Sequence, residues 1–281
     1  MTRTVLVTGA TSGIGRVAAE RLGERGWRVL VHGRDRARGE QVVDAIESAG
    51  GEATFHRADF ADLDAVRELA DQVREEQRLD ALVNNAALST DTYREAGGVE
   101  LTLAVNHLAP YLLTHELVPL LRDSAPARVV VTASGVHFRG EIDPDDLAMD
   151  DYDALDAYAR SKLANVLFAV ELADRLDPDE VTANAYHPGF VPGTGLYRDS
   201  SLAVRLATGL AARLPVVGTS TEAGADGLVY LTASEAVADV TGAYFAHRER
   251  EAPDARARDE RLRERLWTVS ADLVDVDPDW P

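Results

Sequence analysis

Short apolar runs alternate with helical segments along most of the chain. Six runs rich in valine, leucine and alanine predict strands, at Thr4–Gly9, Arg28–Gly33, Ala53–Arg57, Asp80–Asn84, Arg128–Thr132 and Val181–Tyr186. The intervening segments predict helices: one that ends near Glu24, then Arg36–Ala49, Leu63–Glu76, Val99–Leu121 and Asp156–Leu176, and one that starts near Ser220. Apolar strands that alternate with helices predict an α/β fold, a Rossmann-type, doubly wound parallel sheet in a single domain. Ligands bind such sheets at the carboxyl ends of the strands.

Composition excludes several classes of function. The 29 lysine and arginine residues stand against 48 acidic ones, so the formal net charge is −19 and there is no cysteine. This charge repels nucleic acid and anionic membranes, and the missing cysteine rules out disulfides and thiolate catalysis. No apolar run is long enough to span a membrane, and the first strand leaves no room for a signal peptide. We therefore expect a cytoplasmic protein with no nucleic-acid partner, and we predict no metal site.

The acidic excess also favours adaptation to a salt-rich cytoplasm. Lys162 is the one lysine of the chain, so nearly all of its basic residues are arginine. A GC-rich genome is the alternative, since it replaces lysine by arginine without selection on the protein. That alternative explains the rare lysine but not the acidic excess, and halophily is our prediction.

The lone lysine follows Tyr158 by four residues in a predicted helix. That spacing puts both side chains on one helix face, one turn apart. A tyrosine has a pKa of about 10, and a fixed ammonium beside it lowers that pKa and makes the phenol a usable acid and base. A chance pair on a solvated helix is the alternative. We favour a catalytic pair.

A glycine-rich turn joins the first strand to the first helix. Its spacing is Gly9-x3-Gly13-x-Gly15, which differs from the common GxGxxG pattern. A strand, a glycine turn and a helix together place a phosphate group at the helix N-terminus. We assign cofactor binding to Gly9, Thr11, Ser12, Gly13, Ile14 and Gly15, with a glycine-rich turn that only reverses the chain as the alternative.

Several motifs occur together in the order of one known family. They are Thr8–Gly15 (TGATSGIG), Asn84-Asn85-Ala86, Ser134, Tyr158-x3-Lys162 and Pro188-Gly189. Over about residues 1–250 the chain resembles the short-chain dehydrogenase/reductase family. The runs Asn106–Pro110, Ser161–Leu167 and His187–Gly189 resemble its retinol-dehydrogenase-like branch. The resemblance implies a nicotinamide cofactor, hydride transfer to or from a small-molecule carbonyl or alcohol, and a homodimer or homotetramer.

The resemblance implies four catalytic residues, Asn106, Ser134, Tyr158 and Lys162. Tyr158 exchanges the proton, Lys162 also binds the nicotinamide ribose, and Ser134 steadies the substrate oxygen, with Thr132 as its competitor. Pro110 crowds the carbonyl of Asn106, because proline lacks an N–H and clashes at position i−4. That carbonyl then supports a proton relay through water, unless the proline simply kinks the helix.

The same resemblance extends the cofactor site along three further strand ends. Asp59 and Phe60 meet the adenine, although Asp59 could instead cap the next helix. Asn84, Asn85 and Ala86 belong to the segment that lines the adenosine side and stabilises the central sheet. Pro188, Gly189, Val191 and Thr194 approach the nicotinamide carboxamide, and an extra Pro192-Gly193 makes Thr194 the least certain of these assignments. His187 is assigned a structural role.

The end of the second strand predicts which cofactor binds. NAD-specific enzymes place a carboxylate there for the ribose 2′-hydroxyl, whereas a guanidinium grips the 2′-phosphate of NADP. Arg34 takes this position and Asp35 should point away, which predicts NADP(H) rather than NAD(H). A shift of the loop by one residue would reverse the assignment. Arg36 and Arg38 could reinforce the phosphate site or belong only to the next helix.

We expect residues 1–250 to form the dinucleotide-binding and catalytic domain, with a helical substrate lid at about 190–218, and residues 251–281 to form a C-terminal helix and tail. Leucine and tyrosine in the lid and Val136, His137 and Phe138 beside it indicate a lipophilic substrate, with packing of the lid onto the core as the alternative role of these side chains. The stretch Gly140–Asp153 is predicted to be an acidic external loop, and Glu249–Leu266 a solvated helix with self-pairing charges.

A nucleotide-sugar epimerase and a non-catalytic cofactor-sensing module remain as alternatives to the oxidoreductase.

Overall fold

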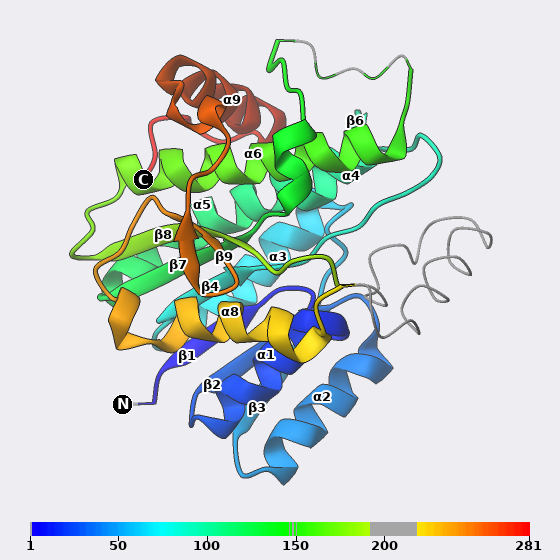
Figure 1. Cartoon of the computed structure of the whole chain (residues 1–281). Coiled ribbons are helices and arrows are strands. Elements are labelled where there is room, and N and C mark those ends of the chain that lie inside the picture. Colours follow the sequence, from blue (N-terminus) through cyan, green and yellow to red (C-terminus); the bar gives the residue numbers. More distant parts are fainter. Residues whose placement is uncertain (1, 146, 148, 150, 192–217) are drawn as a thin grey trace.

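A mostly parallel sheet forms the centre of the protein, and helices cover both of its faces (Figure 1). The computed structural model describes residues 2–145, 147, 149, 151–191 and 218–281. Within these ranges, eight strands pair in the order β10-β9-β8-β7-β4-β1-β2-β3. Their bounds are β1 Thr4–Val7, β2 Arg28–Gly33, β3 Glu52–Arg57, β4 Ala81–Asn84, β7 Ala127–Thr132, β8 Val181–His187, β9 Tyr244–Ala246 and β10 Glu249–Glu251. The chain winds outward from β1 in both directions, which confirms the doubly wound sheet.

Two layers of helices enclose this sheet (Figure 1). Helices α1 (Gly13–Glu24), α2 (Arg36–Ser48) and α8 (Thr221–Ala233) cover one face, and α3 (Leu63–Arg74), α5 (Ala109–Asp123) and α6 (Ala154–Arg175) cover the other. Val5 and Val7 pack under the first layer and Leu6 under the second, as the alternation of side chains along a strand requires. None of the described helices is both long and apolar enough to cross a lipid bilayer.

Short elements complete the described chain. The hairpin β5–β6 pairs Glu95–Ala96 with Val99–Glu100. The predicted helix Val99–Leu121 is divided into α4 (Leu101–Leu103), a π-helical turn at Ala104–Leu108 and then α5. Single 3₁₀ turns lie at Gly135–Arg139, Glu235–Val237 and Ala255–Arg258. Residues 192–217, which hold most of the predicted lid and Thr194, lie outside the described residues.

The prediction of a helix over Glu249–Leu266 is wrong at its start. Glu249–Glu251 is β10, which pairs antiparallel with β9, and helix α9 runs over Glu260–Val274. Every side chain of β10 is exposed and charged, so the sequence carries no apolar signal for this strand. Residue 250, where we divide the catalytic domain from the C-terminal helix, lies in the middle of β10.

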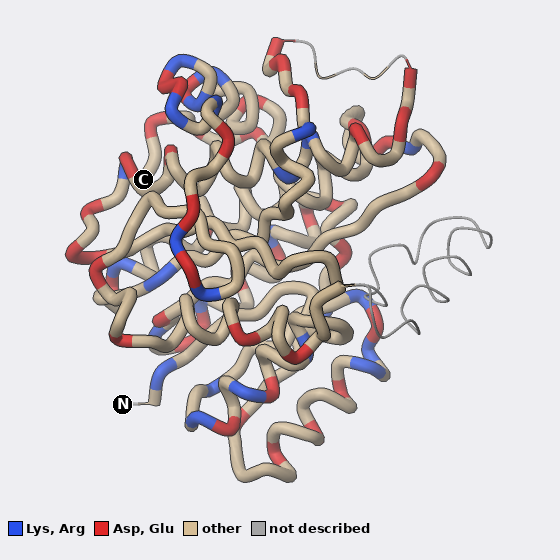
Figure 2. The backbone as a smooth tube through the Cα atoms, in the orientation of Figure 1, with Lys and Arg blue, Asp and Glu red and all other residues tan. Residues whose placement is uncertain are grey.

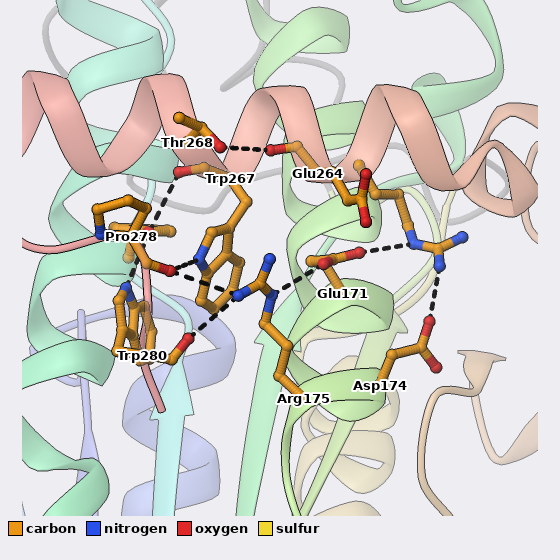
Figure 3. Close-up of polar contacts among 10 residues, drawn as sticks. Glu171, Asp174, Arg175, Glu264, Trp267, Thr268, Pro278 and Trp280 are labelled. Atoms are coloured by element: carbon orange, nitrogen blue, oxygen red, sulfur yellow. Dashed lines mark hydrogen bonds and ion pairs between the residues drawn. The ribbon is translucent and has the colours of Figure 1, made fainter.

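Helix α9 is also less solvated than its composition indicates. It lies across α6, with Trp267 buried in the shared core (Figure 3). Arg263 is buried as well, and it donates hydrogen bonds to the carboxylates of Glu171 and Asp174 on α6, at 3.1 and 2.6 Å. The prediction that the charges of this helix pair only among themselves is therefore wrong for Arg263.

The segment after α9 continues this packing. Trp280 is buried, and its indole N–H donates to the hydroxyl of Tyr111 on α5 at 2.8 Å. The indole N–H of Trp267 donates to the carbonyl of Pro278 at 2.9 Å, and the guanidinium of Arg175 lies over the Trp267 ring (Figure 3). Aromatic packing thus fastens the end of the chain to the helix layer that carries Tyr158 and Lys162.

Acidic residues recur along the helices and loops of both layers (Figure 2). If this surface is a halophilic adaptation, its self-repulsion weakens the fold where salt does not screen it. We expect the thermal midpoint to rise by several degrees or more from dilute buffer to molar KCl, since about 1 kcal/mol shifts the midpoint of a chain of roughly this size by about 2–4 °C. Sucrose is the control, because it strengthens burial without screening charge. A midpoint that KCl does not raise above the sucrose control would favour the GC-rich genome.

Candidate active site

A cleft of about 460 Å³ opens where β1, β2, β4, β7 and β8 end. It brings together nearly all of the residues that the sequence predicts for the site. These are Gly9, Thr11, Ser12, Gly13, Ile14, Gly15, Arg34, Asp59, Phe60, Asn85, Ala86, Ser134, Tyr158, Lys162, Pro188, Gly189 and Val191. Asn106 is fully buried beside the cleft rather than in its lining.

The glycine turn after β1 packs tightly against the end of β4. Gly9 has a φ of +66°, which a residue with a side chain rarely adopts. A Cβ on Gly15 would lie 2.4 Å from the side-chain Nδ2 of Asn85 and 2.6 Å from the carbonyl oxygen of Gly9. Thr8 Oγ accepts the N–H groups of Asn85 and Ala86, at 2.8 and 3.0 Å. The two strand ends are thereby fixed against each other and leave room for a ligand above the turn.

The first turn of α1 is suited to a phosphate. Ser12 begins this helix without capping its amides through its side chain, and the first turn carries no acidic residue. Helices α2, α3 and α6, in contrast, begin with Asp35, Asp62 and Asp153, whose carboxylates accept first-turn N–H groups. A first turn that Ser12 does not cap and the positive end of the helix dipole favour an anion at α1. These residues fit the pyrophosphate of a dinucleotide.

Tyr158 and Lys162 lie one turn apart on α6, as predicted. The Lys162 Nζ is 5.5 Å from the centre of the Tyr158 ring and donates to the Thr132 carbonyl at 2.9 Å. Lys162 is only 1% exposed, whereas Tyr158 is half-buried in the cleft wall. Burial lowers the pKa of Lys162 to about 7, because desolvation penalises the ammonium. The only lysine of the sequence is therefore buried and hydrogen-bonded at a fixed place beside the tyrosine ring.

Ser134 follows β7 in an extended conformation at the mouth of the cleft. Its Oγ accepts the N–H of Val136 at 3.4 Å, which leaves the hydroxyl proton to be donated to a substrate oxygen. Thr132, its competitor, contributes its carbonyl, which accepts from Lys162 and from Asn165 at 2.9 and 3.2 Å. At the same strand end, Ser134 thus presents its hydroxyl to the cleft, and Thr132 presents its carbonyl to Lys162.

Asn106 hydrogen-bonds to two segments beside the cleft, one at Leu88 and one at Ser161. Its Oδ1 accepts the N–H of Leu88 at 2.8 Å, and its Nδ2 donates to the Leu88 carbonyl and to Ser161 Oγ, at 2.9 and 3.0 Å. It lies in the π-helical turn that precedes α5, and Pro110 follows near the start of that helix. A widened turn accommodates a proline that can donate no N–H. The relay role of the Asn106 carbonyl stays a prediction.

The adenosine end of the cleft carries the two charged residues that the sequence singles out. Arg34 and Asp59 are both partly exposed there, with 3.9 Å between Nη1 and Oδ2. Asp62 caps α3, so the alternative that Asp59 is its cap is wrong. Asp35 points away from the cleft, since its carboxylate caps α2 through the N–H of Arg38.

His32 also belongs to this region, although the sequence did not identify it as a site residue. The N–H of Gly9 donates to His32 Nδ1 at 3.4 Å, so Nε2 carries the proton and donates to the Ala58 carbonyl at 3.2 Å. The ring stacks on Phe60 with 4.4 Å between centroids, and burial lowers its pKa to about 4. His32 thus joins the glycine turn to the end of β3. A polar residue inside an otherwise apolar strand was the available signal.

Comparison with known proteins agrees with this geometry. The family described as short chain dehydrogenase matches residues 3–203. Dehydrogenase/reductase SDR family member 13 of Bos taurus is 40% identical over 98% of this chain and 74% of its own length. Retinol dehydrogenase 14 of Homo sapiens is 37% identical over 97% of this chain and 86% of its own length.

Solved structures agree as well. An uncharacterized protein from Mycobacterium paratuberculosis superposes with a TM-score of 0.76 and 29% identity, over 98% of this chain and 94% of that one. A structure from Beutenbergia cavernae, described as an NAD(P) dependent gluconate 5-dehydrogenase with NADP bound at low occupancy, has a TM-score of 0.71 and 29% identity, over 92% and 97% of the two chains. The chain therefore belongs to the short-chain dehydrogenase family and is an oxidoreductase enzyme of that family.

Proposed function

We propose that this enzyme uses NADP(H) to interconvert a carbonyl and an alcohol on a lipophilic, uncharged small molecule. The observation that carries this proposal is that Tyr158, Lys162 and Ser134 line the same cleft as the glycine turn and Arg34. The residues proposed for proton transfer, for binding the substrate oxygen and for binding the cofactor therefore line one cleft.

The residues of the chain have separate tasks in this reaction. When bound, NADP(H) supplies or accepts the hydride. In reduction, the Tyr158 hydroxyl donates its proton to the carbonyl oxygen, and the Ser134 hydroxyl donates a hydrogen bond to the same oxygen. The ammonium of Lys162 stabilises the phenolate that Tyr158 becomes. In oxidation, the phenolate accepts the alcohol proton.

The substrate class is proposed from the rim of the cleft. Phe190 and Leu155 line the cleft yet are 56% and 44% exposed, and Phe138 nearby is 53% exposed. Exposed apolar side chains gathered at the mouth of a cleft indicate an apolar ligand. Val136 also lines the cleft, whereas His137 is fully buried, so its predicted place in the substrate wall is wrong.

A panel of aldehydes and ketones incubated with purified protein and NADPH tests the proposed function. Loss of NADPH absorbance with apolar carbonyls would support it. NADPH binding without turnover of any compound would favour a cofactor-sensing module, and turnover only with nucleotide sugars would favour an epimerase. Preference for charged over apolar carbonyls would contradict the proposed substrate class.

The choice of NADP(H) depends on Arg34. Its side chain reaches the cleft, while the neighbouring carboxylate of Asp35 is held at α2. A guanidinium binds the 2′-phosphate through charge-assisted hydrogen bonds, each worth about 1.5–3 kcal/mol. Arg34→Ala should therefore weaken NADPH binding about 10- to 100-fold and change NADH binding little. Titration of both cofactors by fluorescence measures this difference.

Arg36→Ala is the matched control. Arg36 lies two residues further on, does not line the cleft, and pairs with Glu40 on the exposed side of α2 at 3.4 Å. We expect its NADPH affinity to stay near that of the wild type. Equal affinity of the wild type for NADH and NADPH, unchanged in Arg34→Ala, would overturn the cofactor assignment.

A further inference from the structure

One peptide unit beside the active site, the bond from Ser134 to Gly135, is held by two histidine rings. The Ser134 carbonyl faces His137 Nδ1 at 2.7 Å. The Gly135 N–H donates to His187 Nδ1 at 3.1 Å. Both polar groups of a single peptide plane are therefore bound by imidazoles, immediately after the residue whose hydroxyl faces the substrate.

Each ring has one defined tautomer. The N–H of Asp254 donates to His137 Nε2 at 3.2 Å, so the proton of the neutral ring is on Nδ1, where it points at the Ser134 carbonyl. His187 Nδ1 accepts two N–H groups, so its proton is on Nε2. Burial lowers the pKa of His137, and it lowers that of His187 to about 4, which keeps both rings neutral at pH 7. One ring donates to the peptide and the other accepts from it.

The surroundings keep both rings in place. Tyr244 of β9 packs against both of them, with centroid distances of 4.9 Å to His137 and 6.5 Å to His187. A Cβ on Gly135 would lie 3.2 Å from the His187 ring, so this peptide approaches the ring closely. Little space remains for either ring to rotate.

The second N–H on His187 Nδ1 comes from Gly189, also at 3.1 Å. Gly189 belongs to the loop after β8 that lines the proposed nicotinamide end of the cleft. His187 therefore binds the loop that carries Ser134 and the loop that carries Gly189 through a single nitrogen atom.

We propose that His137 and His187 are positioning residues that hold the Ser134–Gly135 peptide plane so that the Ser134 hydroxyl points at the substrate oxygen, a role that rests on the proposed function. His187 also sets the distance between Ser134 and the Gly189 loop. A displacement of about 1 Å at a reacting group costs on the order of 100-fold in rate, so a clamp on this peptide has a large effect on turnover.

Paired asparagine and glutamine substitutions test this role without removing a buried polar group. Asparagine places a polar atom where Nδ1 lies, whereas glutamine places one where Nε2 lies. His187→Asn and His137→Asn should keep kcat within roughly 10-fold of the wild type, and His187→Gln and His137→Gln should lose about 10- to 100-fold. NADPH affinity should fall in His187→Gln, which also releases Gly189, and stay unchanged in His137→Gln.

Amide hydrogen exchange at Gly135 gives a readout that needs no activity. We expect slow exchange in the wild type and in His187→Asn, and fast exchange in His187→Gln. Equal protection in all three proteins would show that the ring does not hold the peptide and would overturn the inference. Fast exchange in His187→Gln with wild-type kcat would overturn the positioning role. If the wild type reduces no carbonyl, the proposed function fails, and the exchange rates still decide whether the ring holds the peptide.

Discussion

Tyr158→Phe is expected to lower kcat by at least about 100-fold, and by as much as about 10,000-fold, with apolar aldehydes and ketones. The substitution removes only the hydroxyl, so the proton that must reach the carbonyl oxygen is lost. The ring keeps its place on α6 beside Lys162, and the glycine turn and Arg34 are untouched. NADPH binding should therefore remain nearly unchanged while turnover disappears. Steady-state kinetics and a fluorescence titration of NADPH separate the two effects.

Tyr93→Phe is the control for the loss of a tyrosine hydroxyl. Tyr93 is 45% exposed and its hydroxyl donates to Glu95 at 2.6 Å, outside the cleft. Its variant should turn over at the wild-type rate. A kcat for Tyr158→Phe within about threefold of wild type would remove the tyrosine from the proton-transfer step, since general acid catalysis contributes far more than that.

The second large effect is expected at Lys162. Lys162→Arg keeps a positive charge, but the guanidinium is planar and longer, and the site is only 1% exposed. It cannot keep the bond to the Thr132 carbonyl and the place beside the Tyr158 ring together. We expect kcat to fall by about 100-fold or more in both Lys162→Arg and Lys162→Met. Near-normal rates in Lys162→Arg would show that the position of the charge is unimportant.

Replacing Lys162 should raise the stability of the folded protein, although it lowers kcat. The pKa of Lys162 lies near 7 in the folded protein, below its usual value near 10.5, so the unfolded chain holds the proton more tightly between these two values. Burying the ammonium costs stability in full below pH 7, and the cost fades as the pH rises toward 10. Lys162→Met should therefore be more stable than the wild type at pH 6, by on the order of 1 kcal/mol or more, with a smaller difference at pH 9. Urea unfolding of the cofactor-free proteins at the two pH values measures this.

Most strands that could be predicted from the sequence lie inside the sheet and are buried on both faces, and the edge strand β3 is predicted as well, over Ala53–Arg57. β1, β2, β4, β7 and β8 each appear as a run of apolar residues, and their carboxyl ends mark the cleft. β9 and β10 have three residues each, and the three of β10 are all charged. Such short strands depend on their neighbours in the sheet, and no local pattern identifies them.

Candidate site residues could be predicted where a motif and a strand end coincide, as at Ser134, Arg34 and the glycine turn. The hydrogen-bond partners of the histidines behind the site could not be predicted. His32 and His137 each bind through both ring nitrogens, whereas His187 accepts two N–H groups at Nδ1, and most of these backbone partners lie in another segment of the chain. Their partners and tautomers follow from the folded structure alone. Arg263 is a similar case, because its carboxylate partners on α6 lie about 90 residues earlier in the chain.

The position of α9 across α6 has a consequence for the order of events during synthesis. Helix α6, which carries Tyr158 and Lys162, leaves the ribosome first. The residues that cover its outer side are synthesised much later, because Arg263 follows Glu171 by 92 residues. Until then, the carboxylate of Glu171 lacks the ion pair that Arg263 of α9 gives it in the folded protein. Local helices form early, whereas contacts between distant parts of a chain form late. The helix that carries Tyr158 and Lys162 thus reaches its final packing only when translation has passed Trp267, and a nascent chain that stops before that point carries both residues on a helix that lacks its contacts with α9.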